Sequence, residues 1–292
     1  MVVPLKPHKT FKEQLKILKN RGVVISDEKV AIEALRSFGY YRLSGYFYHL
    51  RDGSSNFPSG LKFEQIIMLY EFDNTLRNIV MRHLGIIEIY LRTQISNTFA
   101  KVLGNEAHYD KNNFKKGDWH IEFLKKVDDW IEKNKDIHFV SHHIKEYDGR
   151  MPLWVMLEIT PFSSLSKLYN NMKPNVKEEI GRELKTESKA LNSWLWALSI
   201  LRNTCAHYGR IYNTQFTVAV ILPKWIFRKY NIDNRTFFAY VVCVVSLLPT
   251  PKYRELLLRD LNDLLNRYSE AIDLNCIGFP SNWCEILTSI KF

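Results

Sequence analysis

The stretch LRNTCAHYGR, residues 201–210, places side chains that could act on a phosphate in an otherwise apolar part of the chain. On a helix, Asn203 and His207 are i,i+4 neighbours about 40° apart, and Arg210 lies about 60° back from His207, on the side of Asn203, so all three share one face. Arg202 points about 140° away from His207. Its long side chain can swing toward the imidazole, or it can meet a histidine supplied by a second copy of the helix.

These residue types suit the cleavage of a phosphodiester without a metal or a cofactor. Histidine exchanges a proton near neutral pH, and arginine holds a phosphate through paired donors. Asn203 can fix the imidazole tautomer or bind a substrate oxygen. Because the 2′-hydroxyl of RNA is a built-in nucleophile, a base, an acid and a charge clamp are sufficient. The same spacing also fits a hydrogen-bonded core histidine beside a surface arginine, so the wider sequence decides.

Composition indicates a folded protein with a basic surface. The 292 residues are 46% apolar and 25% charged, and 41 Lys and Arg against 31 Asp and Glu leave a net charge of +10. This excess favours polyanionic partners, although it also suits a merely soluble surface.

Four scattered cysteines match neither a disulfide framework nor a zinc knuckle and indicate a reducing, cytoplasmic setting. We expect no membrane: the start lacks a signal pattern, and the apolar run at 237–249 is too short to span a bilayer and should be a buried helix.

Helical periodicity dominates the sequence, which predicts an all-α fold. A first helix should follow Thr10 as its N-cap and stop at Gly22, and a second should begin at residues 26–28 and run through Leu35. Residues 63–103 predict either one extended helix or two helices with a break near Gly85.

The remaining two thirds of the chain alternate between polar and apolar segments. Residues 104–150 are polar and are predicted to form a variable insertion with a helix at 119–134. Ser163 or Ser164 is expected to cap a helix after Pro161. A long helix should cover 192–213, followed by two or three more helices in the tail. We therefore predict an N-terminal helical module (1–60), a helical core (61–215, with the insertion at about 104–150) and a C-terminal helical extension (216–292).

Three further groups of residues allow two interpretations each. Asp73, Arg77, Glu88 and Arg92 fall within about 100° of arc as two i,i+4 pairs, which is typical of a solvated helix face or of an inward-facing support for a site. The aromatic block FGYYRLSGYFYHLRD at 38–52, with Arg42 and Arg51 interleaved, could pack a small module or stack bases. His138, His142 and His143 lack a complete ligand set, so a solvated loop is favoured over a metal site.

Several blocks in order resemble one family along nearly the whole chain. They are FGYYRLSGY (38–46), YEFDNTLRNIV (70–80), IEIYLRTQIS (87–96), PLWVMLEITPFSSLSKLY (152–169), LRNTCAHYGRIYN (201–213) and GFPSNW (278–283). The chain is similar to the Abi-like (AbiD/AbiF) family of bacterial abortive-infection proteins, which belong to the HEPN superfamily of mainly helical RNases. One departure is Ser163, where family members often have glycine.

The resemblance implies an HEPN-like helical bundle and a role for each residue of the motif. Arg202, Asn203 and His207 occupy the positions of the catalytic Arg, polar residue and His, while Arg210 and Asn213 fit the extension HxxRxxN. With these two, we expect RNA contacts or supporting roles from a further group: Arg42, Asp73, Arg77, Glu88 and Arg92. The family typically dimerises so that two motifs face each other, which implies a homodimer with a composite site.

Three functions follow as hypotheses. The first is a metal-independent endoribonuclease in phage defence, for example the toxin of a toxin–antitoxin pair. The second is a non-catalytic protein that binds RNA, such as a small regulatory RNA, and the third is a partner that senses phage protein after catalysis has been lost. The intact Arg202 and His207 favour the first.

Overall fold

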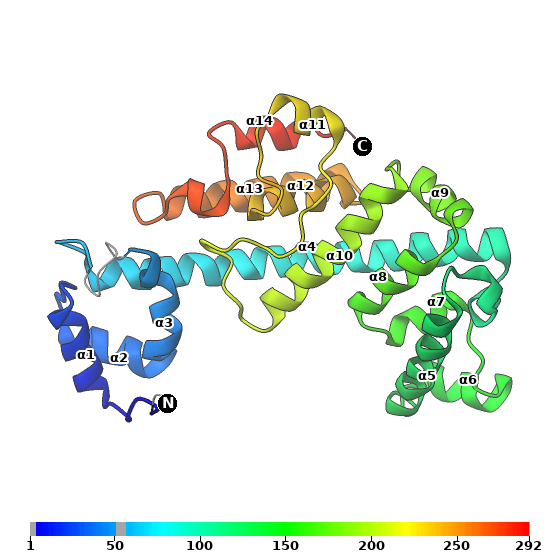
Figure 1. Cartoon of the computed structure of the whole chain (residues 1–292), viewed down its shortest axis with the longest axis horizontal. Coiled ribbons are helices and arrows are strands. Elements are labelled where there is room, and N and C mark those ends of the chain that lie inside the picture. The colour runs from blue at the N-terminus through cyan, green and yellow to red at the C-terminus, as the bar shows by residue number, and fades with distance from the viewer. Residues whose placement is uncertain (1–3, 51–56, 292) are drawn as a thin grey trace.

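The protein is built around one very long helix, α4, which spans Phe63–Leu103. The computed structural model describes residues 4–50 and 57–291 and shows fourteen α-helices and no strand within those ranges. At 41 residues, α4 is roughly 60 Å long. It runs along the molecule, and the other helices are arranged around it (Figure 1). The predicted all-α fold is confirmed.

One continuous apolar stripe explains why α4 is a single helix. The helix passes through Gly85 without a break, so the first of the two alternatives for residues 63–103 is the correct one. Side chains on both sides of Gly85 are fully buried at the three- and four-residue spacing of one helix face. They are Leu76, Leu84, Ile87, Leu91 and Ile95.

The N-terminal helices surround the beginning of α4. They are α1 (Phe11–Asn20), α2 (Glu28–Phe38) and α3 (Tyr40–Phe47), shown in blue in Figure 1. Thr10 caps α1 as predicted, and Glu13 completes a capping box by accepting from the Thr10 N–H at 2.7 Å. Apolar side chains of these helices form a small core together with the first turn of α4: Leu15, Leu18, Leu35, Leu43, Phe47, Phe63 and Ile66.

The middle of the sequence packs at the other end of α4. The predicted helix at 119–134 is present as α5, Gly117–Lys133, but the three histidines lie on a helix, α6 (His138–Tyr147), so a loop was the wrong prediction for them. α7 (Leu153–Met156), α8 (Phe162–Asn171) and α9 (Pro174–Glu183) follow. The N-cap of α8 is Pro161, without a side-chain cap, so neither serine caps this helix.

The C-terminal part also packs on α4, and the tail lies on the side of α4 away from the N-terminal helices (Figure 1). α10 (Ser188–Ala206) packs against α4, α8 and α12, and the tail adds four helices where two or three were predicted. These are α11 (Lys224–Lys229), α12 (Phe237–Leu247), α13 (Pro251–Arg267) and α14 (Trp283–Thr288). α12 is buried at nearly every position, as predicted for 237–249. Across the described ranges, no helix has both the length and the hydropathy needed to cross a membrane.

Candidate active site

The motif lies where α10 ends. The helix stops at Ala206, with His207 as its C-cap, so the predicted helix over 192–213 extends too far at its C-terminal end. The N–H of Tyr208 donates to the Cys205 carbonyl at 3.1 Å, and the N–H of Gly209 donates to the Thr204 carbonyl at 2.7 Å. This pair of bonds is a Schellman motif, which turns the chain sharply away from the helix.

The turn requires unusual backbone at Tyr208 and a glycine at the next position. Tyr208 has a φ of 56°, in the left-handed region that costs an ordinary residue about 1–2 kcal/mol. At Gly209 an added Cβ would lie 2.8 Å from Cγ2 and 3.0 Å from the carbonyl oxygen of Thr204, so a side chain does not fit. Because the helix has ended, Arg210 does not share a helix face with Asn203 and His207, and the prediction that it does is wrong.

The three motif residues lie at the surface of α10, but not all together. Asn203 and His207 are exposed, so the imidazole is open to solvent and is not sealed in the core. The Arg202 guanidinium turns toward α4: its Nε lies 3.9 Å from Oε2 of Glu88, and its Nη1 donates to Oδ1 of Asn203 at 3.4 Å. Within the part of the chain that the structure describes, no hydrogen bond or ion pair joins Arg202 to His207.

Asp73 and Arg77 form a buried ion pair beneath residues 201–213, which we call the motif segment. Asp73 is fully buried and Arg77 is 2% exposed, so a solvated face is the wrong interpretation for this pair. The Asp73 carboxylate also accepts from the hydroxyl of Tyr46 at 2.7 Å and from the backbone N–H groups of Ile211 and Tyr212 at 3.1 and 2.7 Å. Four donors thus converge on one carboxylate and fix the chain just after the helix end to α4.

Burial and hydrogen bonding act in opposite directions on this carboxylate. Burial raises the pKa of Asp73 above its ordinary value, while the Arg77 charge and the bonds from Tyr46, Tyr212 and Ile211 oppose that rise. Arg77 also contacts the motif segment directly, because its Nη1 lies 3.4 Å from the Gly209 carbonyl.

Glu88 and Arg92 form a second pair, which supports Arg202. Arg92 is buried and binds both the Glu88 carboxylate and the Thr160 carbonyl, the latter at 2.7 Å. The chain before α8 is thereby tied to α4. Glu88 therefore lies between two guanidinium groups, those of Arg92 and Arg202, and holds the second of them near the surface. Here too the side chains face inward and not into solvent.

The N-terminal helices and the C-terminal tail both contact the motif segment. Arg42 of α3 donates from Nη1 to the Tyr208 carbonyl at 3.0 Å, and Arg51 lies outside the described residues. Asn213 has a φ of 50°, and its N–H donates to the Cys276 carbonyl at 3.0 Å. The structure thus brings Arg42, Asp73 and Arg77 to the segment after His207, whereas Glu88 and Arg92 lie at Arg202.

Sequence reasoning missed three residues of this arrangement. They are Tyr46, whose hydroxyl bridges Asp73 and Arg77, the strained Tyr208, and Gly209. Only Gly209 carried a signal, because a glycine just after the last periodic residue marks a helix end. As for metals, the described residues include no group of three or more His, Cys, Asp or Glu side chains placed to hold an ion.

Comparison with known proteins identifies the family. A family model described as Abi-like protein matches residues 33–213, which is more than half of the chain and runs from α2 to the end of the motif segment. Neither the comparison with curated proteins nor the comparison with solved structures finds a match. The match includes every predicted site residue, from Arg42 to Asn213. The chain belongs to the family of Abi-like proteins.

Proposed function

We propose that the protein is a metal-independent endoribonuclease of phage defence in which Arg202, Asn203 and His207 act on RNA. Membership of the Abi-like family points to abortive infection, the setting in which the toxin of a toxin–antitoxin pair would act. The observation that best supports this activity is the exposed imidazole of His207 at the end of α10. It lies five residues after Arg202, which Glu88 holds at the surface. This is the RNxxxH arrangement of HEPN RNases, which the resemblance implies.

The chemistry needs one base, one acid and one cation. The His207 imidazole takes the proton of the 2′-hydroxyl, whose oxygen then forms a bond to phosphorus as the bond to the 5′-oxygen breaks. A second imidazole gives a proton to the leaving 5′-oxygen, and the products are a 2′,3′-cyclic phosphate and a 5′-hydroxyl. Arg202 holds the charged phosphate through paired donors.

A second copy of the chain would supply the second imidazole. Two observations support a composite site. Among the described residues, no hydrogen bond or ion pair joins Arg202 and His207 of one chain, and two large apolar side chains are exposed on α4 and α10. These are Ile89 of α4, 67% exposed, and Trp196 of α10, 57% exposed. Apolar side chains of this kind are typical of interfaces between subunits.

Cleavage of RNA in EDTA tests the proposal. Purified wild-type protein is incubated with structured and single-stranded RNA, beside His207→Ala and a control, His142→Ala, which removes an exposed histidine from α6. We expect the wild type and His142→Ala to cut equally and His207→Ala to lose at least 100-fold, the lower range for a general base. Equal cleavage by the wild type and His207→Ala, or no cleavage by either, overturns the assignment.

Mixing the wild type with an inactive variant tests the composite site. Equal amounts of wild type and His207→Ala are unfolded together and refolded, so that half of the dimers contain one chain of each kind and lack the second imidazole. If the site needs His207 from both chains, random pairing leaves about a quarter of the rate of the same total amount of wild type. If each chain carries a complete site, about half of that rate remains.

Binding of a regulatory RNA without cleavage is the second candidate. The net charge of +10 favours it as much as it favours a nuclease. Tight RNA binding that survives His207→Ala, falls in Arg202→Ala and yields no products over many hours would support this candidate over the first.

A further inference from the structure

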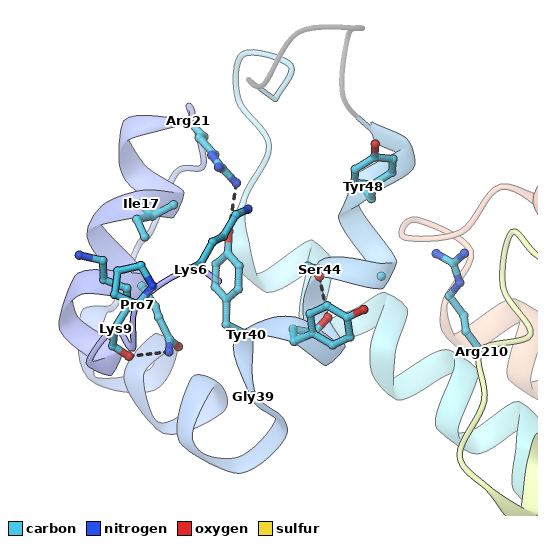
Figure 2. A pocket seen from close by; sticks show the side chains of 13 residues that line it. Lys6, Pro7, Lys9, Ile17, Arg21, Gly39, Tyr40, Ser44, Tyr48 and Arg210 are labelled. Carbon is cyan, nitrogen blue, oxygen red and sulfur yellow. Dashed lines mark hydrogen bonds between the residues drawn. The ribbon is translucent and has the colours of Figure 1, made fainter. Parts of the chain in front are cut away.

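An open cleft of about 970 Å³ lies beside the motif segment, between the N-terminal residues, α1, α3 and Arg210. Figure 2 shows Lys6, Tyr40 and Ser44 along one side of it and Arg210 across from them. The volume is at the upper end of the range for sites that hold small ligands. Only Tyr208 and Gly209 separate Arg210 from His207 in the sequence, so one wall of the cleft belongs to the segment that carries the exposed imidazole.

The lining of the cleft is positively charged. Four cationic residues line it and no acidic residue does. The cations are Lys6, Lys9, Arg21 and Arg210. Lys9 pairs with Glu13 at 3.6 Å, and Arg21 donates to the Tyr40 hydroxyl at 3.1 Å. For Arg210 no carboxylate within 4.0 Å is found among the described residues, so its charge is available to an anionic ligand.

Exposed tyrosine rings accompany these cations. The aromatic block at 38–52 packs inward only in part: Tyr46 and Phe47 are buried, whereas Tyr41, which lines the cleft, is 92% exposed. Tyr208, at the turn after His207, is 65% exposed and is held at a φ of 56°. A large ring in a strained backbone position next to a site indicates a use for its side chain.

Room beside Arg210 depends on a glycine inside a helix. Gly45 is in the interior of α3, where glycine costs roughly 1 kcal/mol relative to alanine. A Cβ at this position would lie 3.9 Å from Nη1 of Arg210, which is ordinary contact. Packing within the chain therefore does not require glycine here, but a larger side chain would reduce the space in front of the guanidinium.

We propose that this cleft binds a single-stranded segment of RNA adjacent to the phosphate that is cleaved, with a base stacked on Tyr41 and a backbone phosphate held by Arg210. Cations follow a phosphate backbone, and exposed aromatic rings stack on bases whatever their identity. A duplex keeps its bases stacked inside and offers no free face to a tyrosine. The inference rests on the proposed function, because the bound strand is the one that His207 cuts.

Fluorescence anisotropy with a labelled eight-nucleotide RNA in EDTA tests the cleft. All variants carry His207→Ala so that the RNA stays intact, and a blunt RNA duplex of equal length is measured in parallel. Tyr41→Ala removes the ring, Tyr41→Phe keeps it, and Gly45→Leu fills the cleft without removing any group. The matched controls are Tyr147→Ala and Arg228→Ala, which change exposed residues of α6 and α11.

The expected results separate the cleft from the nuclease. Tyr41→Ala and Gly45→Leu should each weaken single-strand binding about tenfold, as expected for one lost stacking contact, while Tyr41→Phe and both controls stay within about twofold. Equal binding of the duplex, no effect of Tyr41→Ala, or equal competition by poly-glutamate of the same charge overturns the inference. If the wild type cuts RNA but Tyr41→Ala binds normally, only the cleft fails; if the variants behave as expected but the wild type never cuts, only the nuclease fails.

Discussion

The backbone N–H of Tyr212 donates to the carboxylate of Asp73 at 2.7 Å, across 139 residues of sequence. This bond and its neighbour from Ile211 tie the segment that carries the motif to the long helix α4, together with the contact of Arg77 to the Gly209 carbonyl. The segment is not a free loop after α10. The buried carboxylate of Asp73 fixes this segment at Ile211 and Tyr212, and His207 lies four residues before Ile211.

Asp73→Ala should therefore destabilise the protein strongly. Removal of the carboxylate leaves the Arg77 guanidinium buried without its partner and leaves two backbone N–H groups unsatisfied, which together cost about 3–5 kcal/mol of unfolding free energy. Urea denaturation followed by circular dichroism measures this loss.

An exposed ion pair supplies the matched control for that experiment. In the pair Lys135–Glu132 both side chains are more than half exposed. Glu132→Ala should cost less than about 1 kcal/mol. Similar losses in Asp73→Ala and Glu132→Ala would show that the buried network does not hold the motif segment.

Much of the helical architecture could be predicted from sequence because apolar periodicity records burial directly. The Thr10 cap, the buried helix at 237–249 and the long helix at 63–103 each follow from a local pattern. The face that carries Asp73 and Arg77 does not, because a buried ion pair and a solvated one have the same i,i+4 spacing. The Tyr46 hydroxyl and the distant N–H groups of Ile211 and Tyr212 distinguish the two, and these groups come close to Asp73 only in the folded chain.

The end of α10 shows a second limit of sequence reasoning. Apolar and polar residues continue with helical spacing through residue 213, so periodicity extended the helix too far. Gly209 was the available stop signal, but the left-handed position before it is occupied by Tyr208, where a sequence pattern normally shows glycine or asparagine. A residue that departs from the common pattern at such a position does not signal the helix end, but it does indicate a functional site.

Substitutions at this turn should have opposite effects on stability. Gly209→Ala places a Cβ within 3.0 Å of Thr204, so we expect a loss of about 1–3 kcal/mol and a shift of His207 that lowers cleavage. Tyr208→Gly removes left-handed strain and should leave the stability equal or raise it by about 1 kcal/mol, while weakening RNA binding. Thermal melts and binding assays on both variants measure these effects, and a Gly209→Ala protein as stable as the wild type would contradict the turn geometry.

Glu88 should act on cleavage through Arg202. Glu88→Ala releases the guanidinium from its position 3.9 Å away, and we expect the rate constant for cleavage to fall about tenfold. Stability should fall too, because Arg92 loses its carboxylate. The discriminating readout is a double-mutant cycle: in an Arg202→Ala background, Glu88→Ala should cause no further loss of activity. An equal loss in both backgrounds would assign Glu88 a purely structural role.

Acid should destabilise the protein through His108, which is fully buried near the end of α4. Burial lowers the pKa of His108 to about 4, whereas the unfolded chain titrates near 6.5. Between these values the unfolded state binds more protons than the folded state, so the free energy of unfolding decreases as the pH falls. From pH 7.5 to pH 5 the decrease from this one group is up to about 2 kcal/mol.

In His108→Leu this part of the pH dependence should disappear even if the absolute stability changes, while His142→Ala, at an exposed position, keeps the wild-type slope. Urea unfolding at several pH values measures the slopes, and an unchanged slope in His108→Leu would mean that another buried group causes the acid sensitivity.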